Sequence, residues 1–138
     1  MQNDMPPTPL AQERRSRLRR AYLDGRYSEA FPLARDLAYI GDATAQHTLA
    51  LLYAVGVDGR PDYVNAWAWL MECRHAGGCL EDQDVQELFE DVKAKMSEAQ
   101  KSEAMSLWLR LSNERERRVL SLYGEEALRA QVRRFVSL

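Results

Sequence analysis

Two cysteines and two histidines have the clearest capacity for chemistry in this chain. Cys73, His75 and Cys79 form a C-x-H-x3-C pattern, and His47 could supply a fourth ligand. Tetrahedral zinc favours thiolate and imidazole ligands, but structural zinc sites have more closely paired cysteines. Cys73 also occupies an apolar helical position, which is typical of a small buried residue. We expect no metal, no cofactor and two reduced thiols, with a Cys73–Cys79 disulfide forming only under oxidising conditions.

The motifs of catalytic machinery are missing from the sequence. It contains no Gly-x-Ser-x-Gly nucleophile elbow, no glycine-rich phosphate loop and no His-Glu-x-x-His motif. Its many carboxylates fall on predicted helix faces, where exposure to solvent explains them. The sequence therefore predicts a protein that acts by binding and is not an enzyme.

Charge is unevenly distributed along a chain whose formal net charge is −2. Five arginines lie at positions 14–20 and seven at 110–134, and the segment between these ends is net negative. Dense arginines are typical of nucleic-acid binders, but the pI is near 5.7 and no aromatic residue alternates with the arginines. Nucleic-acid binding is thus a lesser alternative. The acidic run from Glu81 to Asp91 is interpreted as a solvated helix face.

Length and composition indicate one soluble globular domain, with 138 residues of which 46% are hydrophobic. No apolar run approaches the ~20 residues of a membrane-spanning helix, so no membrane insertion is expected. The arginine-rich N-terminus lacks the apolar stretch of a secretory signal. We expect a cytoplasmic protein in which residues 1–7 form a disordered leader.

Helical periodicity predicts an all-α fold for residues 8–138. The stretch from Gly41 to Gly77 has apolar residues at three- and four-residue spacing on both sides of a glycine- and proline-containing turn. Two such helices can bury each other's apolar faces. We expect an α/α superhelical array of about three hairpins, at about 8–40, 42–76 and 82–112, followed by a cap at 114–138.

The predicted hairpins repeat one another. Leu18 and Tyr22 stand 31 residues before Leu49 and Tyr53, and the offset becomes 36 after a five-residue insertion in the turn. A fainter third copy has Phe89 in the place of Tyr53. An internal repeat with an insertion at a turn is typical of helical repeat arrays, in which each hairpin covers its neighbour.

The second helix of the third predicted hairpin is followed by a cap at residues 114–138 that closes the array. Ser97-Glu98-Ala99-Gln100 is a capping box that begins a helix, and Tyr123-Gly124 marks an expected break. We therefore expect one or two short capping helices at the end of the stack.

The central unit carries a pattern of small, aromatic and glycine residues. It consists of Gly41-x-Ala43-x-Ala45, Leu49-Ala50-x-x-Tyr53-x-x-Gly56, Asp62, Ala66-x-x-Trp69 and Gly77. This pattern is similar to the Sel-one-like repeat, a longer-looped relative of the tetratricopeptide repeat. The resemblance implies a bacterial adaptor that binds another protein. A cognate immunity or inhibitor protein against a toxin or effector is the alternative.

The resemblance also implies that the first helix of each hairpin lines a groove for a partner helix or peptide. Counting from each helix's core position gives the side chains expected there. They are Glu13, Ser16, Arg20, Thr44, His47, Leu51, Gln83, Glu87 and Glu90. Such a groove would run from cationic to anionic and favour a charged partner. The alternative is that the C-terminal helices fill it.

Trp67 is the candidate for an exposed anchor, because it follows the apolar position Ala66. An exposed tryptophan could hold a partner protein or a second copy of the chain as a homodimer. The alternative is that Trp67 packs against the next repeat.

Overall fold

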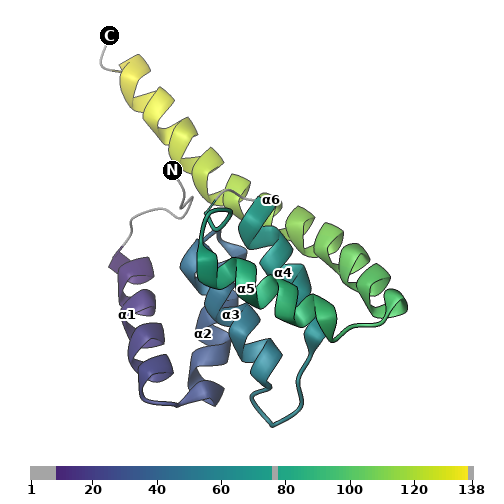
Figure 1. The fold of residues 1–138 in the computed structure, drawn as a ribbon. Helices are drawn as coiled ribbons and strands as arrows, with labels where there is room; N and C mark the ends of the chain where they lie inside the picture. Colours follow the sequence, from purple (N-terminus) through teal and green to yellow (C-terminus); the bar gives the residue numbers. More distant parts are fainter. Residues whose placement is uncertain (1–8, 76–77, 137–138) are drawn as a thin grey trace.

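In the computed structural model, residues 9–75 and 78–136 are described, and they form helices without any strand. The helices are α1 (Pro9–Leu23), α2 (Tyr27–Tyr39), α3 (Ala43–Val55), α4 (Tyr63–His75), α5 (Gln83–Ala94) and α6 (Glu98–Val136). Each helix from α1 to α4 packs against the next, as Figure 1 shows. The predicted all-α array of packed helices is confirmed, and the leader expected at residues 1–7 lies outside the described residues.

None of the described helices combines the length and the apolar character needed to span a bilayer.

Side-chain caps determine where four of the helices begin. Asp42, Asp62 and Asp82 each accept a hydrogen bond from the backbone N–H three residues on, at 3.0, 3.0 and 3.2 Å. Because N–H groups in a first turn have no partner within the helix, these carboxylates stabilise the starts of α3, α4 and α5. The capping box at α6 is confirmed: the Ser97 hydroxyl accepts from the Gln100 N–H, and the Gln100 side chain accepts from the Ser97 N–H.

An aromatic contact recurs between successive hairpins. Phe31 of α2 packs edge-to-face on Tyr53 of α3, with ring centroids 5.0 Å apart, and Trp67 of α4 packs on Phe89 of α5 at 5.1 Å. Both members of the second pair lie 36 residues after those of the first. Trp67 is 7% exposed, so the prediction of an exposed anchor is wrong. Its indole packs against the next repeat instead.

The last helix departs from the predicted hairpin pattern. α5 packs on α4 and α3, whereas α6 packs on α4 and α2 and makes little contact with α5. α6 continues without interruption through Gly124, so the expected break at Tyr123-Gly124 is wrong. A glycine inside a helix costs only about 1 kcal/mol relative to alanine, which a 39-residue helix tolerates. Its yellow C-terminal half projects beyond the other helices (Figure 1).

A buried carboxylate on α4 fixes the position of α6. Glu72 is fully buried, and its Oε1 accepts a hydrogen bond from the indole N–H of Trp108 at 2.9 Å. Its other oxygen pairs with the buried guanidinium of Arg115, also on α6. Because an unpaired buried charge is strongly unfavourable, Glu72 requires α6 to present both donors at this place.

The structure joins Cys73 and Cys79 in a disulfide, with their Cα atoms 5.3 Å apart. The expectation of two reduced thiols is therefore wrong. Cys73 is fully buried, as its helical position predicts, and Cys79 lies in the segment that leads to α5. The bond ties the last turn of α4 to the start of the next repeat.

Removing one member of the Glu72–Arg115 pair should destabilise the chain more than replacing both. Arg115→Leu leaves the Glu72 carboxylate buried without its cation, and we expect the free energy of unfolding to fall by about 3–5 kcal/mol. The double variant Glu72→Leu/Arg115→Leu should recover much of this loss, because no buried charge remains. Urea unfolding followed by circular dichroism measures both. Arg117→Leu, at an exposed position of the same helix, is the control, and equal losses in the single and double variants would contradict the expectation.

Candidate functional site

A groove of about 540 Å³ lies between α1 and α3. α1 packs on α2 but makes little contact with α3, whereas α3 does contact α5. Packing therefore leaves the space beside α1 open. The residues that line this α1–α3 groove are Arg15, Leu18, Arg19, Tyr22, Leu23, Leu37, Asp42, Thr44, Ala45 and Thr48.

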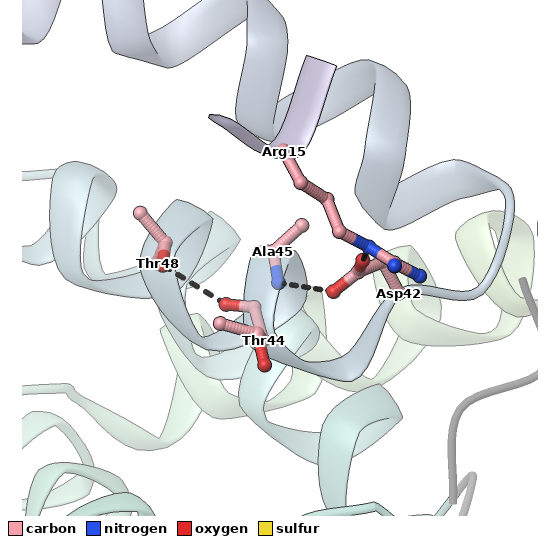
Figure 2. Close-up of polar contacts among 5 residues, drawn as sticks. All are labelled: Arg15, Asp42, Thr44, Ala45 and Thr48. Carbon is pink, nitrogen blue, oxygen red and sulfur yellow. Dashed lines mark hydrogen bonds and ion pairs between the residues drawn. The ribbon is translucent and has the colours of Figure 1, made fainter. Parts of the chain in front are cut away.

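An ion pair joins the two walls of the groove. Nε of Arg15 on α1 lies 2.6 Å from Oδ2 of Asp42, whose Oδ1 accepts the N–H of Ala45 at 3.0 Å. Figure 2 shows this carboxylate between the two helices, next to the hydrogen bond from the Thr48 hydroxyl to the Thr44 carbonyl. Asp42 is buried, and Arg15 is more than a third exposed. One carboxylate thus caps α3 and anchors α1.

The groove combines an apolar floor with a cationic edge. Leu18 and Leu37 are buried at its base, and Leu23 is exposed at one end. Arg19 is exposed and makes no ion pair within the described part of the chain. Burial, and to a lesser extent Tyr27, raises the pKa of the Tyr22 phenol above its ordinary value of 10.0, so this hydroxyl remains a donor at neutral pH. Such a surface suits an apolar segment that carries a carboxylate.

A second, smaller hollow continues the groove toward the end of α3. It shares Tyr22 with the α1–α3 groove, and its other lining residues are apolar or glycine apart from the Tyr27 ring. They are Tyr27, Leu51, Leu52, Val55, Gly56 and Val57. The exposed side chain of Val55 extends the apolar floor beyond the last turn of α1.

The residues predicted to face one continuous groove do not meet in a single site. Thr44 lines the α1–α3 groove, and Leu51 lines the adjoining hollow. His47 is half-buried on α3 and lines neither. Glu13, Ser16 and Arg20 are exposed on α1 outside the groove, and Gln83, Glu87 and Glu90 line a separate acidic hollow on α5.

The side chains of α1 that do line the groove flank its core residue. Arg15, Arg19 and Tyr22 stand three before, one after and four after Leu18. Sequence periodicity favours positions on the side of α1 opposite Leu18. The groove runs along the flank of α1, so the side chains that line it are those adjacent to Leu18. Helical spacing from Leu18 was the signal that could have found them.

The C-terminal helix does not fill the groove. α6 packs on α2 and α4, the second helices of their hairpins, and not on the first helices. The alternative that C-terminal helices occupy this space is therefore wrong.

Within residues 9–75 and 78–136, no cluster of His, Cys, Asp or Glu side chains is arranged to hold a metal ion. Because the sulfurs of Cys73 and Cys79 are bonded to each other, the thiolate set considered from the sequence does not exist in this structure.

No protein-family model, curated protein or solved structure matches this chain.

Acidification should destabilise the fold through His47. Burial lowers the pKa of its imidazole below the ordinary value of 6.5, although Asp82 and Asp84 act in the opposite direction. Because the unfolded chain then binds the proton more readily, stability present at neutral pH is lost as the pH falls through the unfolded value. We expect a lower urea midpoint at acidic than at neutral pH, and a smaller difference in His47→Gln. His75→Gln, at the other histidine, is the comparison; an unchanged pH difference in His47→Gln would exclude this role.

Proposed function

We propose that this chain is a Sel-one-like repeat protein that binds another protein without catalysis, as a cytoplasmic bacterial adaptor. The partner supplies an apolar segment with acidic side chains, which enters the α1–α3 groove. The open groove beside α1 is the observation that carries this proposal. The first helices of repeat arrays present such surfaces to their ligands.

The repeated aromatic contact supports the repeat assignment. Phe31 with Tyr53, and Trp67 with Phe89, couple each hairpin to the next at the same 36-residue offset. A chain built from one module along a common axis has neighbouring first helices on one side, and ligands contact that side.

Arg19 supplies the positive charge that selects the partner. The charge of Arg15 is compensated by Asp42, whereas Arg19 is exposed at the groove and unpaired within the described residues. A partner carboxylate beside Arg19 would gain a favourable contact while its apolar neighbours bury Leu18 and Leu23.

A charge reversal at Arg19 should weaken partner binding, and the same reversal at Arg17 should not. Peptides selected from a random display library on the wild-type chain serve as probes, and fluorescence anisotropy measures their dissociation constants. We expect Arg19→Glu to raise the dissociation constant at least about 10-fold, because a contact worth about 1.4 kcal/mol becomes repulsive. Arg17 is an exposed arginine of the same helix that does not line the groove, so Arg17→Glu is the matched control. Selected peptides that bind Arg19→Glu as tightly as wild type would reject the groove as the site.

Nucleic-acid binding is the second candidate, because Arg17, Arg19 and Arg20 are all exposed on α1. Phosphate contacts depend on charge and not on groove shape, so both Arg17→Glu and Arg19→Glu would reduce DNA binding, with a steep dependence on salt. The same pair of variants therefore distinguishes the two functions.

A further inference from the structure

The α1–α3 groove is the first of three hollows that join end to end. The adjoining hollow shares Tyr22 with it, and a third hollow of about 420 Å³ shares Leu52, Gly56 and Val57 with that one. The third hollow lies where the start of α2, the end of α3 and the turn at residues 56–62 meet. We call the three hollows together the surface channel. It follows α3 and then passes around the end of that helix.

Aromatic and aliphatic side chains form the walls of the third hollow. The rings of Phe31 and Tyr53 pack edge-to-face with centroids 5.0 Å apart, Leu52 is buried, and Val57 is 37% exposed. Apolar surface gains free energy when it is removed from water. The third hollow therefore suits an apolar side chain of a bound segment.

The charged side chains at the edge of the third hollow nearly balance one another. Asp62 caps α4, and its two oxygens accept hydrogen bonds from the backbone and side-chain amides of Asn65 at 3.0 and 2.8 Å. Asp58 accepts the backbone N–H of Arg60 at 3.0 Å. Two aspartates and one arginine leave little net charge, so apolar contact decides what this hollow binds.

The charge that selects a partner lies at the other end of the surface channel. Arg19 is exposed beside the α1–α3 groove and makes no ion pair within residues 9–75 and 78–136, whereas Asp42 compensates the charge of Arg15. A partner carboxylate is therefore most favourable beside Arg19. Along the channel, one cationic position is followed by two apolar ones, at the exposed Val55 and in the third hollow.

The middle hollow limits the conformation of a segment that follows the whole channel. Its volume is about 50 Å³, against about 540 and 420 Å³ for the hollows on either side. A helix with its side chains is about 10 Å across, which is too wide for this constriction. An extended chain is narrower and rises about 3.3 Å per residue. From Thr44 to Gly56 the rise of α3 is about 18 Å, the length of about five or six extended residues.

We propose that the partner binds the surface channel through an extended segment of about eight residues, of which the last two or three occupy the third hollow. The segment carries, in order, a carboxylate and two apolar side chains. The carboxylate lies beside Arg19, the first apolar side chain contacts Tyr22 and Val55, and the second packs beside Phe31. This inference rests on the proposed function, because it names the chemistry of the segment that enters the α1–α3 groove.

A substitution in the third hollow tests the length of the site. The probes are the peptides selected on the wild-type chain, and fluorescence anisotropy measures their dissociation constants. We expect Val57→Gln to raise the dissociation constant at least about 10-fold, because its amide would be buried without a hydrogen-bond partner. Leu109→Gln makes a similar change at an exposed leucine of α6 and should leave binding unchanged. Circular dichroism verifies that both variants remain folded.

Paramagnetic labels on the same peptides test the order of the contacts. A nitroxide at the acidic end of the bound peptide should broaden the backbone amide signals of Arg15 and Arg19. A nitroxide at the opposite end should broaden those of Gly59 and Arg60, in the turn that borders the third hollow.

The results separate this inference from the proposed function. If Arg19→Glu weakens binding while Val57→Gln does not, and the second label leaves the turn unaffected, the site ends at the α1–α3 groove and the inference is wrong, but the proposed function stands. A bound peptide that is helical would also overturn the inference. If Arg19→Glu leaves binding unchanged, the proposed function fails, and this inference fails with it.

Discussion

The architecture depends on one buried carboxylate, that of Glu72. Removing a carboxylate from water is costly, and the cost is offset only when its oxygens are fully partnered. Trp108 and Arg115 supply those partners from successive parts of α6. This pairing holds α6 against α2 and α4, the second helices of their hairpins, and two features follow from it. The groove beside the first helices stays open, and the end of α6 leads away from the body.

A second carboxylate, that of Asp42, sets the geometry of the groove. α1 is the terminal helix of the array and packs mainly on α2. The ion pair from Arg15 joins it to the first turn of α3, but the contact is confined to one end of the space between them. Beyond that point the groove separates Tyr22 of α1 from Thr48 of α3, above the buried Leu18. The groove is thus a product of incomplete packing at the array edge.

Local sequence patterns predict where most of the helices lie, but not which side chains are buried, paired or in the groove. The equivalence of Tyr53 and Phe89 follows from spacing alone, because a repeated module places equivalent residues in equivalent contacts. Trp67 is predicted as an exposed anchor from its sequence position, since periodicity within one helix cannot reveal that the next hairpin covers it. No local pattern identifies Glu72 as a buried, paired carboxylate, because its partners lie on α6, far along the sequence. The glycine at position 124 predicts a break, but the flanking helical residues outweigh one unfavourable propensity.

Because α6 continues without interruption, a tilt of its packed part is transmitted to its far end. The guanidinium of Arg118 lies 4.2 Å from the centre of the Tyr39 ring of α2, a contact between α6 and the other helices further along the chain than Arg115. At ~1.5 Å of rise per residue, the helix extends about 27 Å from Arg118 to its end at Val136, so Arg118 serves as the pivot. By this geometry, a tilt of about 10° at the pivot would sweep the tip through about 5 Å, roughly one helical turn. A small change in packing around Glu72 would therefore produce a large displacement at the far end of α6.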